Sequence, residues 1–419
     1  MHPLAMRLFT GFSLVLISCQ MLVAQATSRT AEIEAAREVR SQSLESDRVS
    51  DTEAFLLYIK DQKILERVSA GLSGFRLKLG GLVTGSGFAL GPEYLRRDLA
   101  RGKITLRISA QSSFKKYQKY DLQVSLPSLA QDRLFFEFYA VHHRYPGLDY
   151  YGPGGDSLEE NRTTYLLEDS AFDGVAGFRP FRYADVGFSG GYVFLNVGPG
   201  GDGSFPSTEK VFTAEQTPGI DRQTEFLRYG AFTRLDYLDN PGGPRSGGQY
   251  SMQFDHYVDR KLGLHDFNRL DFEIQQYIPF FNKRRVVALR LKSSLTFHES
   301  SQVIPFYFQP VLGGSDDLRG FRSFRFYGDN LLLANVEYRW ETFSGLDSAL
   351  FLDIGKVFSD HGQWNFKNME SSAGFGFRFN IRNSVFLRID TGFSREGAQV
   401  WLKFSDIFAG KPLRFSSPY

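Results

Sequence analysis

Apolar and polar side chains alternate residue by residue in many short segments of this 419-residue chain. In Ile104–Gln111 every second residue is apolar and those between are polar, and Tyr120–Leu126 and Leu270–Ile278 follow largely the same pattern. Neighbouring side chains of a β-strand point to opposite faces, so each segment predicts a strand with one apolar and one polar face. Such strands need a sheet that meets an apolar medium on one side and a polar medium on the other.

Sixteen such strands can be placed after residue 70. Their approximate centres are Leu77, Leu90, Leu106, Leu122, Phe138, Ala176, Tyr192, Thr233, Phe254, Ile274, Leu291, Val336, Leu352, Phe377, Leu387 and Leu402. Brief connections such as Phe280–Arg284 alternate with longer ones, of which the longest are His142–Thr164, Gly198–Glu225, Glu299–Asn330 and Phe358–Ser371. Short turns on one side of the membrane and long loops on the other are typical of outer-membrane barrels, whose closure removes sheet edges. The predicted fold class is all-β, a sixteen-stranded antiparallel transmembrane β-barrel.

Composition agrees with a membrane barrel. Aromatic residues make up 15% of the chain, and 41 Phe and 41 Gly fit strands, tight turns and the aromatic girdles at the membrane surfaces. The formal net charge is only +2, without the basic balance that a dedicated nucleic-acid binder carries. We therefore expect the lipid bilayer of the outer membrane as a partner, and no nucleic acid.

The first 26 residues have the features of a secretory signal peptide. Arg7 precedes an apolar run from Leu8 to Ile17, and Ala24-Gln25-Ala26 has the small-x-small form that signal peptidase accepts. An alternative is a lipoprotein signal, because Leu16-Ile17-Ser18-Cys19 resembles a lipobox and would leave a lipidated Cys19. Cys19 is the only cysteine, so after cleavage at Ala26 the protein has no disulfide and no thiolate metal site.

A short helical segment is expected between the signal and the barrel. Residues 31–40 and 52–69 contain no Gly or Pro and are rich in helix-forming residues. This segment either lies against the barrel rim in the periplasm or enters the lumen as a plug. The expected organisation is a signal peptide at 1–26, a periplasmic helical segment at 27–70, the barrel at 71–408 and a tail at 409–419, with the N-terminus in the periplasm.

The most informative stretch lies in and after the long connection Glu299–Asn330, which we call loop six. It contains Gly313-Gly314 and Leu318-Arg319-Gly320-Phe321, and Phe351-Leu352-Asp353-Ile354-Gly355 follows in a later strand. Strand parity places Glu337 and Asp353 on the polar face of two neighbouring strands. An arginine in a glycine-rich turn, followed by acids on one strand face, predicts an ion pair inside the barrel.

With the strands placed, these motifs resemble those of the BamA/TamA superfamily, the assembly and translocation barrels also called bacterial surface antigens. Residues 318–321 resemble its V-R-G-F/Y motif, and residues 351–355 are similar to its F-x-D-x-G motif in the thirteenth strand. The resemblance extends from Gly71 to Phe408 and includes the turn Asp239–Gly247. It implies that Arg319 sits at the tip of the sixth external loop and reaches into the lumen to pair with Asp353 and Glu337.

The chain departs from the family pattern in three respects. It leaves no room for tandem POTRA domains, and it contains no patatin-like lipase domain. Phe408 resembles the aromatic end of a C-terminal targeting strand, but eleven residues follow it. Asp406 also interrupts the apolar alternation of the preceding residues. These departures mainly affect what the resemblance implies about partner and client proteins.

No other motif indicates catalysis, a cofactor or a metal. His142 and His143 are adjacent in a predicted strand and would point to opposite faces, which is poor metal-binding geometry. Gly187–Gly191 matches the pattern G-x-S-x-G, but it lies within a predicted strand with no helix after it, so it is not a nucleophile elbow. No recognisable nucleophile–base arrangement occurs. We therefore predict that the protein is not an enzyme, although a hydrolase site assembled from separate strands is a remaining, least favoured, alternative.

The resemblance implies a barrel that assists the assembly or translocation of outer-membrane or exported proteins. In this family the seam between the first and last strands can loosen and template clients by strand addition. Here that seam would join Gly74–Leu82 to Gln399–Phe408. The alternative is a passive outer-membrane pore or structural barrel in which loop six acts as a plug.

Overall fold

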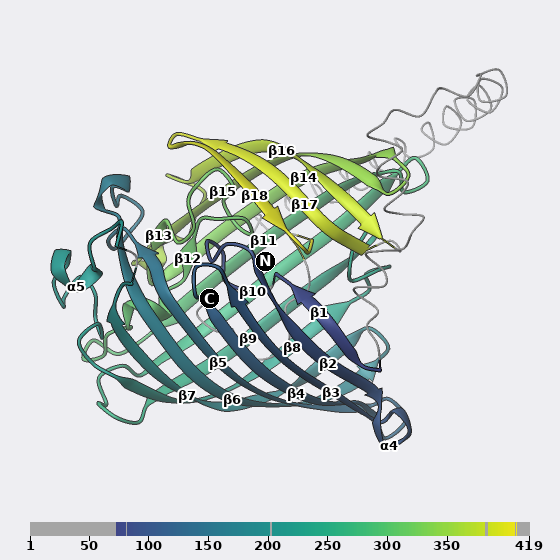
Figure 1. Ribbon diagram of the computed structural model, residues 1–419, viewed down its shortest axis with the longest axis horizontal. Helices are drawn as coiled ribbons and strands as arrows, with labels where there is room; N and C mark the ends of the chain where they lie inside the picture. The colour runs from purple at the N-terminus through teal and green to yellow at the C-terminus, as the bar shows by residue number, and fades with distance from the viewer. Residues whose placement is uncertain (1–72, 81, 202, 382–383, 407, 409–419) are drawn as a thin grey trace, which may run out of the picture. The chain divides into compact units, whose positions relative to one another are not determined.

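A computed structural model describes residues 73–80, 82–201, 203–381, 384–406 and 408. Sixteen antiparallel strands form one sheet, and each pairs with its neighbours in chain order (Figure 1). These strands are β1 (Phe75–Leu79), β2 (Ala89–Asp98), β3 (Ile104–Ser113), β4 (Gln118–Leu129), β5 (Leu134–Tyr150), β6 (Thr163–Phe181), β7 (Ala184–Pro199), β8 (Thr224–Asp236), β9 (Gly247–Asp259), β10 (Phe267–Phe280), β11 (Arg285–Phe297), β14 (Asn330–Phe343), β15 (Leu346–Phe358), β16 (Glu370–Ile381), β17 (Ser384–Ser394) and β18 (Gly397–Lys403).

The remaining elements are short and lie in the connections. They are α4 (Leu99–Gly102), η1 (Glu159–Asn161), α5 (Thr208–Val211), η2 (Phe306–Phe308), η3 (His361–Gln363) and the small hairpin of β12 (Val311–Leu312) and β13 (Phe326–Tyr327). None of the helices in the described part of the chain is long and apolar enough to cross a membrane.

The sixteen strands predicted from the sequence are confirmed, and each predicted centre lies inside an observed strand. Their polarity is that of a membrane barrel rather than a soluble sandwich. On β15, Leu352 is 47% exposed while its neighbour Asp353 is fully buried. The outward face is thus apolar and the inward face polar, which is the pattern of a barrel with lipid outside and a polar interior.

The predicted long loop between β5 and β6 is shorter than expected, because its flanking strands continue beyond the length that a bilayer requires. β5 has 17 residues and β6 has 19, whereas a tilted transmembrane strand needs about 9–11. The predicted loop His142–Thr164 is therefore reduced to residues 151–162. The extension does not keep the apolar–polar alternation, since β5 contains Pro146-Gly147 and its register with β6 shifts between Tyr145 and Leu148. The sequence pattern therefore did not indicate that these strands continue.

The two ends of the sheet are not paired to each other in the described residues. β1 pairs only with β2, and β18 pairs only with β17. The contacts across this seam are made by side chains: Lys403 Nζ lies 3.3 Å from Thr84 Oγ1, and the rings of Phe88 and Phe404 are 5.9 Å apart.

The predicted extent was wrong for both strands of the seam. β1 ends at Leu79 rather than Leu82, and β18 spans Gly397–Lys403 rather than reaching Phe408. After β1 the chain turns inward, and Leu82 and Val83 pack against buried aromatic residues of the interior. Phe408, expected at the end of the last strand, is also buried inside.

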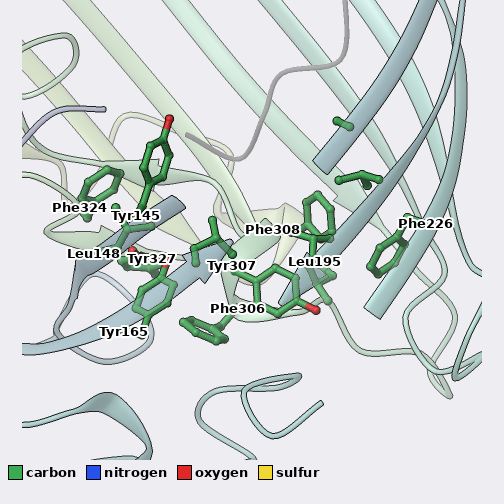
Figure 2. Packing of buried hydrophobic residues seen from close by; sticks show 14 of the residues in the cluster. Tyr145, Leu148, Tyr165, Leu195, Phe226, Phe306, Tyr307, Phe308, Phe324 and Tyr327 are labelled. Carbon is green, nitrogen blue, oxygen red and sulfur yellow. Dashed lines mark hydrogen bonds between the residues drawn. The ribbon is translucent and has the colours of Figure 1, made fainter. Parts of the chain in front are cut away.

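Loop six, the connection between β11 and β14, runs from residue 298 to 329 and folds into the interior. Its first part, η2, carries three buried aromatic residues, Phe306, Tyr307 and Phe308. Figure 2 shows these rings packed with Leu195 of β7 and Phe226 of β8. The rest of the loop reaches the wall formed by β14–β18, where it meets the predicted site residues.

The predicted signal peptide at 1–26, the helical segment at 27–70, Cys19 and the tail at 409–419 lie outside the described residues. The organisation predicted for these parts of the chain stays a prediction.

Candidate functional site

The tip of loop six begins with two glycines in conformations that other residues rarely adopt. Gly313 has φ +113° and Gly314 has φ +106°. A Cβ on Gly313 would lie 2.4 Å from the carbonyl oxygen of Arg322, and a Cβ on Gly314 would lie 2.9 Å from Thr84. Only glycine tolerates both the backbone angle and this close approach. The two glycines therefore turn the loop toward the wall of the barrel.

Arg319 is completely buried and binds two acids of the barrel wall. Its Nε and Nη2 lie 2.9 and 2.8 Å from the two oxygens of Asp353 on β15, and its backbone N–H donates to the same carboxylate at 3.1 Å. Its Nη1 lies 2.6 Å from Glu337 Oε2 on β14. The guanidinium also lies over the ring of Phe351, 3.4 Å from the centroid. The bidentate geometry uses the fixed fork of arginine, which lysine does not offer.

The acids that bind Arg319 stabilise its charged form. Burial by itself would lower the pKa of the guanidinium, but Asp353 and Glu337 raise that pKa well above its ordinary value. Arg319 therefore carries its positive charge in the folded protein. The arginine side of the pair does not titrate.

Gly320 brings the backbone of the loop directly onto the wall. A Cβ on Gly320 would lie 2.6 Å from the Cβ of Ser372 and 2.8 Å from the carbonyl of Phe393. A second glycine, Gly392 on β17, faces it: a Cβ there would lie 2.4 Å from the carbonyl oxygen of Arg319. Gly320 of the loop and Gly392 of the wall therefore lie in close backbone contact, which side chains at these positions would prevent. Sequence reasoning missed Gly392, although its strand parity with Asp390 placed it on the inner face.

The backbone of the tip is held by three wall side chains. Trp401 of β18 donates to the carbonyl of Arg319 at 2.8 Å, and Ser394 of β17 donates to the carbonyl of Gly320 at 2.7 Å. Asn335 of β14 donates to the carbonyl of Asp317 at 2.8 Å. These bonds satisfy carbonyls that the irregular loop leaves without backbone partners.

Leu318 and Phe321 flank Arg319 and face an apolar cluster rather than the charges. The cluster comprises Leu312, Leu318, Phe321, Phe326, Leu331, Leu333 and Val357. Gly355 of β15 borders it, since a Cβ there would lie 3.0 Å from Leu312 Cδ1. Of the strand motif, Phe351, Asp353 and Gly355 thus lie in or beside one contact region with loop six, whereas Leu352 faces outward.

Glu337 is the centre of a larger network of buried charges. Besides Arg319, it accepts from Arg339 Nε at 2.7 Å and from Arg378 Nε and Nη2 at 3.0 and 2.9 Å. Arg378 Nη1 donates to Asp390 at 2.6 Å, and Arg339 donates to both oxygens of Asp406 at 2.8 and 2.9 Å.

The network is formally close to neutral. Asp353, Glu337, Asp390 and Asp406 supply four negative charges, and Arg319, Arg339, Arg378 and Arg388 supply four positive ones. Removing one partner of a buried pair leaves the other charge uncompensated, which costs more than the pair contributes. Loss of one partner is therefore destabilising, and the network joins loop six to β14, β15, β16 and β17.

His142 and His143 point to opposite sides of β5 and make separate contacts. His142 Nδ1 lies 2.9 Å from Ser170 Oγ, whereas His143 is buried with Nδ1 3.0 Å from Asp169 Oδ2. Within the described residues no group of three or more His, Cys, Asp or Glu side chains is arranged to hold a metal ion. The two histidines do not form one site.

The interior beside loop six contains a cavity of about 630 Å³. Charged side chains of both signs line it, among them Arg228, Asp173, Arg269, Glu273 and Arg290. On one side it meets the aromatic cluster of Figure 2, in which Tyr327 and Tyr165 join Phe306. Loop six thus spans the interior from an aromatic contact on β5–β10 to the ionic contact on β14–β17.

Comparisons with known proteins identify the family to which this barrel belongs. The sequence from residue 105 to 395 matches the family model of the Omp85 superfamily domain. No curated protein matches the sequence.

Two solved structures illustrate the similarity of fold. BamA from Haemophilus ducreyi lacking POTRA domains 1–3 has 13% sequence identity and a TM-score of 0.60, with 79% of this chain and 69% of that chain covered. CdiB from Escherichia coli has 13% identity and a TM-score of 0.53, with 78% of this chain and 61% of that chain covered. At this identity the likeness concerns the fold, whereas the domain match covers well over half of the chain. The chain is a bacterial outer-membrane β-barrel that belongs to the Omp85 superfamily.

Proposed function

We propose that this barrel assists the assembly or translocation of other outer-membrane or exported proteins by offering them the unpaired edges of its seam. One observation supports this most directly: in the described residues β1 and β18 each have a sheet partner on one side only. An unpaired edge presents a row of backbone donors and acceptors to an incoming strand. Strand addition of this kind supplies main-chain hydrogen bonds without demanding a particular client sequence.

The ionic contact of loop six gives this seam a rigid side. Arg319, Glu337 and Asp353 would act as a lock that fixes loop six to β14–β17, so that β18 has a stable wall behind it. β1 has five residues and β18 has seven, and each has one sheet neighbour. We infer that β1 is the side that moves when a client strand enters. The N-terminus would lie in the periplasm, where clients arrive, and the long connections would face outward.

The test is to lock the seam chemically. One cysteine is introduced in β1 and one in β18, and a bifunctional maleimide joins them in cells. The matched control places cysteines at Thr233 and Met252, which face each other in the paired part of the sheet. We expect the seam cross-link, and not the control, to lower the amounts of client proteins measured by outer-membrane proteomics. Normal client levels with a fully cross-linked seam would refute the proposal.

A passive pore with loop six as plug is the second candidate, and the charged cavity of about 630 Å³ favours it. The same cross-linked protein separates the two functions. A pore conducts ions through its lumen. If the barrel is only a pore, cross-linking the seam would change neither its ion conductance in planar bilayers nor the amounts of the client proteins. A loss of clients at constant conductance favours assembly.

A further inference from the structure

The chain leaves the sheet after Lys403 and enters the interior of the barrel. Asp406 is 4% exposed and Phe408 is 1% exposed, although both follow the last strand by only a few residues. The alternation of Val400 and Leu402 would carry the strand onward if Asp406 did not interrupt it. A carboxylate on the lipid side of a strand is unfavourable, which removes one reason for the strand to continue.

Asp406 is bound by an arginine that is itself part of the ionic network. Arg339 of β14 donates Nη1 and Nη2 to the two oxygens of Asp406 at 2.8 and 2.9 Å, a bidentate pair. The remaining Nε of Arg339 donates to Glu337. Arg339 is 5% exposed, so the acid is recognised in a nearly dry site.

Phe408 occupies an apolar site beside that pair. Its ring lies 6.2 Å from the ring of Tyr277, at an edge-to-face angle of 67°, and it packs in one cluster with Val286 and Ala288. The guanidinium groups of Arg339 and Arg290 lie 5.7 and 5.8 Å from the centre of the Phe408 ring. An aromatic ring between apolar walls and two cations is favoured over an aliphatic side chain.

The segment is held by these two side chains rather than by its backbone. Among described residues 404–406 and 408, no backbone–backbone hydrogen bond to the barrel occurs. The amide of Phe408 instead donates to the side chain of Asp406 at 3.3 Å. The segment is thus anchored by two side chains, an acid and an aromatic residue two positions later, as a bound peptide ligand would be.

We propose that the β10–β11–β14 wall contains a peptide-binding site for an acidic residue followed two positions later by an aromatic one, and that Asp406 and Phe408 are its resident ligand. Occupancy keeps residues 404–406 and 408 out of the sheet, so β18 stays short and, among the described residues, Ser384–Leu387 of β17 are not paired with β18, although the amide of Val385 donates to the carbonyl of Gly242. Release would let β18 lengthen along β17 toward β1. This consequence for the seam rests on the proposed function, whereas binding at the site does not.

Fluorine NMR tests the site directly. The full chain is folded in detergent with 4-fluorophenylalanine at position 408. We expect a shifted resonance from the buried ring in the unaltered protein, loss of that resonance in Asp406→Asn, and its retention in Asp406→Glu, which keeps the carboxylate. Ser405→Ala, a neighbouring change without charge, should leave it in place. An identical 408 resonance in Asp406→Asn would overturn the proposal.

A second variant guards against a general folding defect. Ala288→Leu adds volume where Phe408 packs without changing any charge, so it should expel the ring while the heat-modifiable mobility of the folded barrel persists. A peptide with the sequence of residues 402–410, labelled with a fluorophore, is then added to the double variant Asp406→Asn, Phe408→Ala.

We expect this peptide to bind the double variant and not the unaltered protein, whose site is filled. A peptide with Asn in place of the acid should bind about tenfold more weakly, the effect of losing a charge-assisted pair. Equal binding of the two peptides, or binding to neither protein, would overturn the proposed recognition. Both readouts concern only the interior site, so they stand apart from the seam cross-linking that tests the proposed function.

Discussion

At the scale of single residues, Arg319 is the charge whose removal would leave a buried carboxylate without compensation. In Arg319→Ala, Asp353 loses the only arginine bound to it in the described residues. Leaving one member of a buried pair uncompensated costs about 3–5 kcal/mol. We expect a lower urea midpoint for unfolding of the barrel and faster trypsin cleavage within loop six. Arg319→Lys should recover little, because an ammonium group cannot bind two carboxylates in the same forked geometry.

Arg322 provides the matched control in the same loop. It pairs with Glu159 at 2.8 Å, but its side chain is 42% exposed. An exposed pair contributes about 0–1 kcal/mol, so Arg322→Ala should leave both the urea midpoint and the cleavage rate nearly unchanged. Equal effects of the two substitutions would show that burial of Arg319 is not what holds the loop.

Gly392 makes a second prediction at this scale. In Gly392→Ala the new methyl group would lie 2.4 Å from the carbonyl oxygen of Arg319, so loop six must move away from β17 or the strand must bend. Gly190→Ala on β7 is the control, since a methyl group there would have nothing within 4 Å of it. Protease resistance of loop six should fall in the first variant only; resistance retained in Gly392→Ala would contradict the close contact.

At the scale of elements, loop six has two attachments of different chemistry. The aromatic residues of η2 lie on the β5–β10 side, and Arg319 lies on the β14–β17 side. The sequence predicted the second attachment through its glycine and arginine motif. It did not predict the first, because Phe306, Tyr307 and Phe308 show no strand or helix periodicity and their partners come from strands far away in the chain.

Removing the aromatic attachment should open the interior without breaking the ionic one. Phe306 and Phe308 are essentially fully buried, and Phe→Ala in such a site costs about 3–5 kcal/mol. For Phe306→Ala, Phe308→Ala we expect higher ion conductance in planar bilayers. Val303→Ala, at a 48% exposed position of the same loop, should not raise it. Unchanged conductance in the aromatic double variant would mean that another segment closes the cavity.

At the scale of the whole molecule, stability should be unevenly distributed around the sheet. β6 pairs along almost its full length with both β5 and β7, whereas β1 pairs over five residues with β2 alone. Amide exchange follows local opening, which is easiest where backbone hydrogen bonds are few. Hydrogen–deuterium exchange should therefore be several-fold faster in β1 and in Ser384–Leu387 than in β6. Protection of β1 equal to that of β6 would indicate that the seam is paired in solution.

The sequence by itself determined the fold class, the number of strands and the side on which each side chain lies. Period-two alternation is a local property, and each strand carries it independently of its neighbours. For the same reason, parity placed Glu337 and Asp353 on the inner face, and the glycine-rich turn identified Arg319 as the residue of loop six to examine.

Tertiary structure alone decided where the strands stop and what fills the interior. β18 ends at Lys403 because Asp406 and Phe408 find partners on β14, β10 and β11. Gly392 matters because a loop distant in sequence lies against it. The network around Glu337 needs Arg339, Arg378 and Arg319 from three separate segments. Such contacts depend on how the curved sheet brings distant residues together, and no local pattern in the chain encodes that proximity.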